Sequence, residues 1–164
     1  VESVPRRGFF VRLFSKEEMV YIFELREVLE GLAARRAAAK ITDSQIIELD
    51  KFFKPFAGKK NISDYKSYAR EDRRFHKFVI DVGAKEFLKS ILQTTNIISF
   101  SYQVLHSEGL VRPPNETIQE HLAVIEAIKN RDPIAAEDLM RVHFKKSLVF
   151  LKREINGSED NINA

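Results

Sequence analysis

The sequence predicts an all-α fold, a single antiparallel bundle of about six helices that follows a short extended N-terminal segment. Three observations favour it. The 164 residues include only six Gly and five Pro, mostly between long stretches whose apolar residues recur at helical spacing. The length suits one domain, and 44% apolar with 31% charged residues is typical of a globular protein. The connections between the periodic stretches are short, which favours antiparallel neighbours.

Residues 1–14 depart from the helical pattern. Here Pro and Gly accompany alternating apolar and basic residues, which is typical of a strand or an extended linker, although the segment is too short to make a sheet alone. The segment is locally basic, since four Lys or Arg side chains face a single Glu within the first 16 residues. Because Val1 already lies within this pattern, we expect the chain to be a fragment of a longer protein.

Capping signals mark the starts of several helices. Ser15 with Glu18, and Thr42 with Gln45, form capping boxes in which side chains satisfy the free backbone NH groups of a first turn. Asp132 precedes a Pro at the first helical position, where the missing NH costs nothing. The expected helices span 15–40, 42 to about 55, 61–83, 84–106, 115–128 and 133–156, giving one all-helical domain over 15–156 and a polar, frayed tail over 157–164.

Composition excludes several classes of protein. With no Cys, the chain cannot hold a disulfide, a thiolate zinc site, an iron-sulfur cluster or a Cys nucleophile, and a reducing cytoplasm is the expected compartment. No apolar run approaches the length of a membrane span, and the N-terminus lacks the apolar block of a signal peptide. A net charge of +3 is too mild to predict a nucleic-acid surface.

Four side chains are candidates for a metal site. Asp72 and His76 are four residues apart, which places both on one face of a helix, one turn apart. His121 and His143 lie on the apolar faces of two later helices, so a bundle can bring all four together. Burying three imidazoles and a carboxylate in one small core would be costly without a partner, and a divalent cation supplies the opposite charge.

The same residues also have a structural interpretation. A single His on an apolar stripe is usually a hydrogen-bonded core residue, and Asp72 has Arg neighbours with which it could pair. His106, at the end of the fourth helix, is out of step with the others and is expected in solvent. Three His and one carboxylate suit Zn, Ni, Mn, Co or Fe, and the donor set does not choose among these metals.

Five segments of the chain form a recognisable series: 4–11, 22–34, 72–76, 120–128 and 140–143. In this order and spacing they resemble the effector domain of GntR-type transcriptional regulators of the FadR subfamily, the FCD domain. No single motif is decisive, but the resemblance covers nearly the whole chain. One departure is Gly83-Ala84-Lys85, where family members commonly have Gly-Asn-Pro.

The resemblance implies a helical bundle that senses a small carboxylate metabolite beside a divalent metal, with Zn or Ni favoured, and that forms a homodimer. The family's metal positions fall on Asp72, His76, His121 and His143. Residues 1–14 then resemble the end of a DNA-binding wing and its linker, so operator DNA would be bound only through an N-terminal domain absent from this chain. Arg26 is a candidate partner of the effector carboxylate; the alternative is an ion pair with Glu30 or Glu24.

Two other functions remain open at this stage. A small helical-bundle hydrolase could use the same ion to activate water, although the sequence has no HExxH motif and no His-Asp dipeptide. A purely structural dimerisation bundle would hold no ion. Apolar residues of the first and fourth helices could form a dimer interface, or they could belong to the core.

Overall fold

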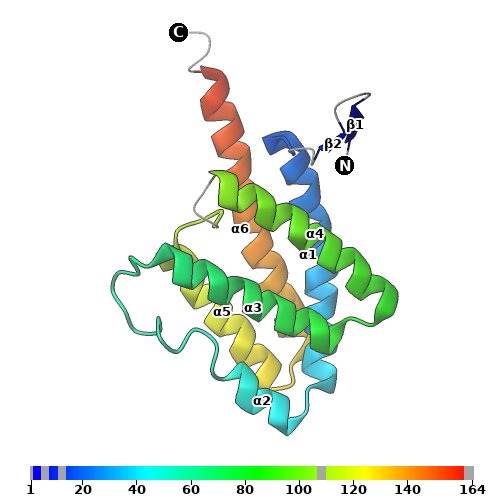
Figure 1. Cartoon of the computed structure of the whole chain (residues 1–164). Helices are drawn as coiled ribbons and strands as arrows, with labels where there is room; N and C mark the ends of the chain where they lie inside the picture. The colour runs from blue at the N-terminus through cyan, green and yellow to red at the C-terminus, as the bar shows by residue number, and fades with distance from the viewer. Residues whose placement is uncertain (1, 5–7, 11–13, 107–109, 161–164) are drawn as a thin grey trace.

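The computed structural model describes residues 2–4, 8–10, 14–106 and 110–160, and over these ranges the fold is all-α, as predicted. A hairpin of two short strands stands at the N-terminal end (Figure 1). The elements are β1 (Glu2–Val4), β2 (Gly8–Phe10), α1 (Lys16–Lys40), α2 (Asp43–Leu49), α3 (Tyr65–Gly83), α4 (Glu86–His106), α5 (Pro114–Lys129) and α6 (Pro133–Asp160).

The N-terminal segment is extended where the structure describes it. β1 pairs with β2 in an antiparallel ladder whose register places Glu2 opposite Phe10. The two strands therefore do make a minimal sheet, contrary to expectation, because they pair with each other. Residues 1, 5–7 and 11–13 of the predicted segment lie outside the described residues.

The long helices α1 and α6 form the central pair of the bundle and run in opposite directions (Figure 1). Ion pairs at both ends of the contact define this direction: Arg35 with Glu137, and Glu24 with Lys152. The capping boxes at Ser15 and Thr42 are both formed, as the sequence predicts. Helices α3 and α5 complete the layer that encloses the core, and α4 packs on α1 and α3.

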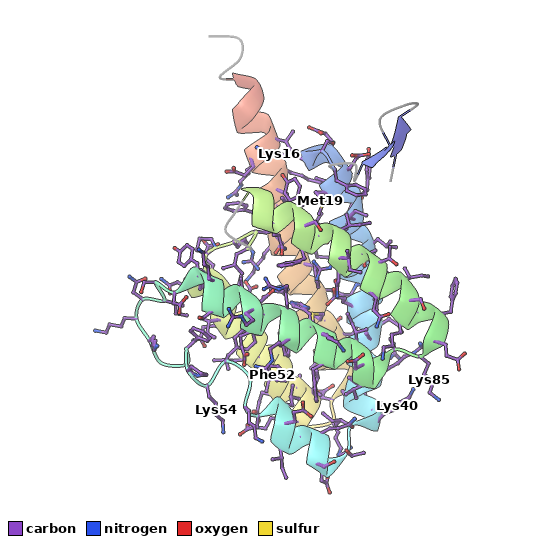
Figure 2. The ribbon with its side chains drawn as sticks, viewed as in Figure 1. Lys16, Met19, Lys40, Phe52, Lys54 and Lys85 are labelled. Carbon is purple, nitrogen blue, oxygen red and sulfur yellow. The ribbon has the colours of Figure 1, made fainter. Side chains whose placement is uncertain are left out.

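Aromatic side chains fill much of the space between these helices (Figure 2). Phe53, Tyr68 and Phe75 are fully buried, and the ring of Phe53 contacts Tyr68 at a tilt and Phe75 edge-on. Phe144 of α6 contacts Phe23 of α1 edge-on. Burial of these rings, together with the aliphatic side chains of the core, is the main stabilising contribution to the bundle, since apolar area removed from water dominates folding. None of the helices in the described ranges is long and apolar enough to cross a membrane.

Several helix boundaries differ from the prediction; α3, for example, begins at Tyr65 and not near residue 61. α2 ends at Leu49, and the chain continues in turns in which Phe53 adopts a left-handed φ of 59°. This path buries Phe52, Phe53 and Phe56 together in the core. At the other end of the chain, α6 continues to Asp160, so the first four residues of the expected tail are helical, and 161–164 lie outside the described residues.

The end of α3 approaches the backbone of α1 very closely. A Cβ atom on Gly83 would stand 1.9 Å from the carbonyl oxygen of Ala33, so only glycine permits this contact. Because His76 lies two turns earlier on α3, the close approach helps to set how deeply its imidazole enters the bundle.

A candidate metal centre

The structure brings the three predicted histidines together in the core. His76 of α3, His121 of α5 and His143 of α6 are all buried, and each offers a ring nitrogen that lies within 4.8 Å of the others. The ring centroids of His121 and His143 are 4.5 Å apart. Side chains from three helices therefore converge on one point, which is how helical bundles build metal sites.

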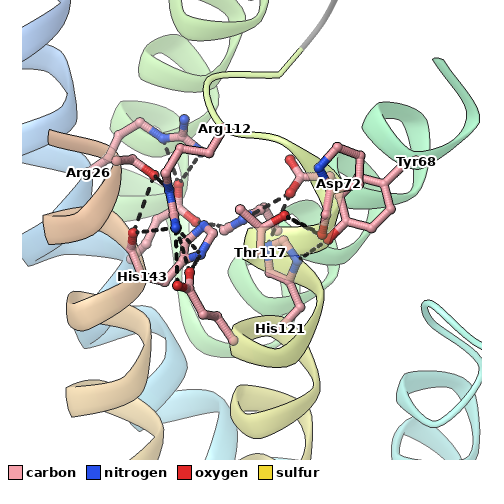
Figure 3. A network of polar contacts seen from close by, with 12 residues as sticks. Arg26, Tyr68, Asp72, Arg112, Thr117, His121 and His143 are labelled. Atoms are coloured by element: carbon pink, nitrogen blue, oxygen red, sulfur yellow. Dashed lines mark hydrogen bonds and ion pairs between the residues drawn. The ribbon is translucent and has the colours of Figure 1, made fainter. Parts of the chain in front are cut away.

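Asp72 completes the set. Its Oδ1 atom lies 3.1 Å from His121 Nε2 and 3.9 Å from His76 Nε2, and its side chain is 18% exposed. Figure 3 shows Asp72 and His121 facing each other across the space between α3 and α5. All four residues that the helix-face argument selects thus lie at one site. His106 belongs to α4, and its side chain lies outside those that the structure describes.

Two glutamates fix the imidazoles of His76 and His143. His76 Nδ1 lies 2.6 Å from Glu30 Oε2, and His143 Nδ1 lies 2.8 Å from Glu120 Oε2. An ionised carboxylate only accepts hydrogen bonds, so each Nδ1–H donates to its glutamate. In a neutral ring this leaves the lone pair on Nε2, the nitrogen available to a metal ion.

A chain of hydroxyl groups orients His121 in the same way. Thr117 donates its hydroxyl hydrogen to the carbonyl oxygen of Pro114, so its Oγ1 atom accepts from the Tyr68 hydroxyl at 2.9 Å. The Tyr68 oxygen then accepts from His121 Nδ1–H at 3.0 Å (Figure 3). His121 Nε2 consequently carries the lone pair and points toward Asp72.

Each glutamate is in turn held by a buried arginine. Arg26 binds Glu30 at 2.8 Å, and Arg112 binds Glu120 with two of its nitrogens while donating to Ser147 Oγ and to the carbonyl oxygen of His143. The centre is therefore supported on two sides by Arg–Glu–His chains. These charge-assisted hydrogen bonds compensate for the burial of both cations and both anions.

The electrostatics favour neutral rings at His121 and His143 beside an ionised Asp72. Burial, followed by repulsion from His121, lowers the pKa of His143 to about 3, and burial also lowers the pKa of His121. Burial alone would raise the pKa of Asp72, but the ring of His121 at 3.1 Å and the other two histidines nearby hold that pKa well below its usual value. Neutral His and ionised Asp are the protonation states that bind divalent metals.

One atom of the site lacks a hydrogen-bonding partner. His121 Nε2 is buried and forms no hydrogen bond to any described residue, because its approach to Asp72 lacks hydrogen-bond geometry. Buried polar atoms are nearly always satisfied in folded proteins, and a deprotonated ring nitrogen is satisfied by a cation. Three imidazole nitrogens and a carboxylate oxygen are a donor set for Zn, Ni, Mn, Co or Fe, so the residues present fit such an ion.

A cavity of about 400 Å³ opens beside this centre. Asp72 and His76 form one end of its wall, and the rest comes from α3 and α4, with Arg26 contributing from α1. Arg26 is held by Glu30, one of the two alternative partners expected for it, and its guanidinium also lies 4.7 Å from the ring centre of Phe144. It therefore reaches the cavity as part of an ion pair.

Sequence reasoning missed most of the supporting residues. Glu30 is recognisable only as a helical neighbour of Arg26, and Glu120 only as the residue before His121. Nothing in the local sequence of Tyr68 or Arg112 marks them, since their partners are far along the chain. Arg112 follows α4 in a connection, and its role depends entirely on where α5 and α6 lie.

Comparison with known protein families decides the classification. Residues 21–146, well over half of the chain, match the family model described as the FCD domain. The chain belongs to the FCD domain family. This confirms the resemblance inferred from the sequence, and the four residues of the centre all fall within the matched range of this FCD domain.

Curated relatives of this FCD domain are regulators of transcription by name. The HTH-type transcriptional repressor RspR of Escherichia coli K12 is 26% identical over 156 residues, covering 89% of this chain and 64% of RspR. The uncharacterised HTH-type transcriptional regulator YdhC of Bacillus subtilis is 23% identical over 163 residues, covering 98% of this chain and 72% of YdhC. The chain thus spans about two thirds of the length of these relatives.

A solved structure shares the fold. The chain described as Streptococcus agalactiae GntR superposes with a TM-score of 0.56 at 22% sequence identity, over 83% of this chain and 60% of that one. At this identity the likeness concerns the arrangement of helices. It agrees with the all-α bundle described above.

Proposed function

We propose that this FCD domain is the effector-sensing and dimerisation domain of a DNA-binding transcriptional regulator, and that it binds a small carboxylate metabolite at a divalent metal site. The observation that carries the proposal is the convergence of three buried imidazoles and Asp72, with a partnerless nitrogen at His121. The cavity of about 400 Å³ that reaches this centre is within the size range of small-molecule sites.

The residues have distinct roles in this proposal. His76, His121, His143 and Asp72 would hold the ion, and Glu30 would keep His76 in the tautomer that leaves Nε2 free. A divalent ion at this position would supply a positive charge that anchors the carboxylate of the effector. Arg26, with its charge already balanced by Glu30, would shape the cavity wall and add hydrogen-bond donors there.

The uncharged outer surface of α4, together with α1, supports a homodimer. From Ser90 to His106 the sequence contains no Asp, Glu, Lys or Arg, which is unusual for a helix with a solvent-facing side. Of the ten large apolar side chains that are exposed among the described residues, five belong to α1 and α4: Tyr21, Leu25, Val28, Phe87 and Ile97. We therefore place the dimer interface on these two packed helices, one of which lines the cavity.

Operator DNA would be bound through a helix-turn-helix domain that this chain does not include. The names of the curated relatives support a regulator over the alternative of a metal-dependent hydrolase. Effector binding between α3 and α4 would change the position of α4 in the dimer interface and so the spacing of the two DNA-binding domains.

Metal analysis of protein purified without a metal-affinity tag tests the centre. We expect about one transition-metal ion per chain. In metal-stripped protein, Zn or Ni at about 100 times its dissociation constant should stabilise the fold by about 2.7 kcal/mol, which raises the unfolding temperature by roughly 5–10 °C.

Two variants are compared. His143→Ala removes one of the ring nitrogens that would bind the ion, and Glu116→Gln changes an exposed residue of α5. The first should abolish the metal-dependent stabilisation and the second should retain it. Absence of metal in the purified protein, combined with equal responses of wild type and His143→Ala to added Zn or Ni, would refute the proposed site.

A further inference from the structure

A second cavity, of about 590 Å³, lies between α3 and the chain that connects α2 to it (Figure 1). One wall comes from the end of α2 and the turns that follow it. The other wall is the face of α3 that points away from the metal centre, with residues three or four apart along the helix: Ser67, Arg70, Glu71 and Arg74. The cavity is therefore separate from the metal centre and from the cavity beside it.

The wall opposite α3 is held in a fixed, non-helical path. Phe53 has a left-handed φ of 59°, a conformation that costs energy for a residue with a side chain. Its backbone NH donates to Glu71 Oε1 at 3.3 Å, and its buried ring stacks on that of His121 with 4.7 Å between the centroids. Glu71 also binds Arg74 at 2.7 Å. Because these contacts fix the turns against α3, the cavity is formed before a ligand enters it.

Positive charge gathers around this cavity. Residues 51–77 contain nine of the 27 Lys and Arg of the chain but only three of its 24 Asp and Glu. Most cations elsewhere in the described ranges form a salt bridge, as Lys89 does with Asp81. Lys51, Lys59 and Arg70 line the cavity and form no salt bridge with any described residue. Their charges are therefore available to an anion.

Two of these cations lie near the same point although they come from different walls. Asp64 accepts a hydrogen bond from the backbone NH of Ser67 as the cap of α3. Hydrogen bonding from Ser67 lowers the pKa of Asp64, and the charges of Arg70 and Lys59 add to this effect, so both cations lie close to that carboxylate. Lys59 also lies 5.7 Å from the ring centre of Phe56. The structure thus sets a lysine and an arginine on either side of one end of the cavity.

The chemistry of the lining defines its complement. A phosphate monoester carries a charge of about −1.5 to −2 and several acceptor oxygens, which suits converging cations better than a single carboxylate does. Ionised Asp64 and Glu48 only accept hydrogen bonds, so beside the phosphate they favour hydroxyl groups, which can donate. Phe52, Pro55 and Phe56 offer apolar contacts to the CH groups of a ligand.

We propose that this cavity is a second binding site, for a phosphorylated, polyhydroxylated small molecule of the sugar phosphate class. Lys59 and Arg70 bind the phosphate, Lys51 adds positive charge, and Asp64 and Glu48 accept from the hydroxyls. A volume of about 590 Å³ is within the size range of small-molecule sites. The site uses none of the four residues of the metal centre, so it does not depend on the function proposed above.

Calorimetric titration of metal-free protein tests the site, since without the ion no probe can bind through metal coordination. The probes are D-glucose 6-phosphate, D-fructose 6-phosphate and D-ribose 5-phosphate, compared with D-glucose, inorganic phosphate and a hexaglutamate peptide. We expect at least one sugar phosphate to bind with a dissociation constant below about 1 mM, roughly tenfold or more tightly than inorganic phosphate or the peptide. D-glucose, which lacks the phosphate, should show no measurable binding.

Matched changes of charge locate the site. Lys66→Gln is the control, because Lys66 is an exposed cation of α3 that forms no salt bridge with a described residue and does not line the cavity. Lys59→Gln and Arg70→Gln should each weaken binding of the preferred sugar phosphate by about tenfold or more, because each removes a charged hydrogen-bond donor. All three residues are exposed, so the variants should keep the unfolding temperature of wild type.

The outcomes are distinct from those that test the metal centre. The proposal is overturned if none of the three sugar phosphates binds, or if inorganic phosphate or the peptide binds as tightly as the best of them. Equal weakening in Lys59→Gln and Lys66→Gln would indicate a diffuse attraction and would overturn it as well. Protein that holds no metal under any condition contradicts the proposed function and leaves this second site standing.

Discussion

Each imidazole of the centre is fixed by a hydrogen bond at Nδ1. Glu30, Glu120 and the hydroxyl of Tyr68 provide these bonds at 2.6, 2.8 and 3.0 Å. Such contacts fix both the orientation of the ring and the position of its proton, so in the proposed site Nε2 would be ready to bind an ion. The residues that hold these histidines would then contribute to metal affinity without touching the metal.

Replacement of Glu120 by Gln tests this contribution. The change keeps the shape of the side chain but removes the charge that accepts from His143 Nδ1–H and pairs with Arg112. We expect the affinity for Zn or Ni to fall by about 10- to 100-fold, measured by competition with a chromophoric chelator. Glu116→Gln, one turn earlier on α5, is the matched control, and equal affinities for the two variants would argue against the role of Glu120.

The lowered pKa of Glu30 should make the free energy of unfolding of the metal-free protein depend on pH. Burial opposes its ionisation, but Arg26 and His76 lower its pKa from 4.5 to about 2. A depressed pKa stabilises the fold above the unfolded value, so this stabilisation, about 3 kcal/mol in order of magnitude, is present above pH 4.5 and is lost as the pH falls toward 2.

The free energy of unfolding of wild type and Glu30→Gln, measured in urea, should therefore differ at pH 6 and converge between pH 4.5 and 2. The comparison with the variant cancels the titration of carboxylates that both proteins share. A difference that stays constant down to pH 2 would show that the charge of Glu30 does not contribute.

Among the helices, the crossing of α1 and α3 sets the depth of His76. Gly83 is a point of very close approach in this crossing, since a Cβ atom there would lie 1.9 Å from Ala33 O, an atom that cannot move without shifting α1. The hydrogen bond between Glu30 of α1 and His76 of α3 joins the same two helices. A local separation of α1 and α3 would therefore change the distance between these two side chains.

Gly83→Ala is consequently expected to destabilise the fold by about 2 kcal/mol or more, and to weaken metal binding as well. Gly31→Ala is the control, because its Cβ would meet side-chain atoms, Arg141 Cγ at 2.6 Å and Arg141 Cδ at 3.1 Å, which shift more readily than the backbone of α1. Alanine also suits a helix better than glycine by roughly 1 kcal/mol, so this variant should remain near wild-type stability. Chemical denaturation of both proteins measures the contrast, and equal stabilities would contradict the close packing at Gly83.

At the scale of the whole molecule, the exposed apolar side chains of α1 and α4 define the expected dimer. Leu25→Glu and Ile97→Glu each place a charge on this face, and burying an unpaired charge in an interface is strongly unfavourable. We expect each to weaken the dimer by at least about 100-fold, as measured by light scattering after size exclusion over a range of concentrations. Ile134→Glu changes an equally exposed residue at the start of α6 and should leave the dimer intact.

The helices and the inward placement of His76, His121 and His143 were predictable because they depend on local periodicity. Apolar residues at a spacing of three and four identify the buried face, and a histidine in step with them must enter the core. The early end of α2 was not predictable in this way, since it depends on three nearby phenylalanines finding space in a core that other helices build.

The sequence by itself determined the fold class, the family and the four residues of the candidate metal centre, because helix spacing and motif order are properties of the chain. Only the tertiary structure decided which atoms support those residues. Glu30 lies 46 positions before His76, and Arg112 lies 31 before His143, so neither contact has a local signature. The cavity and the partnerless nitrogen of His121 exist only where separate helices meet.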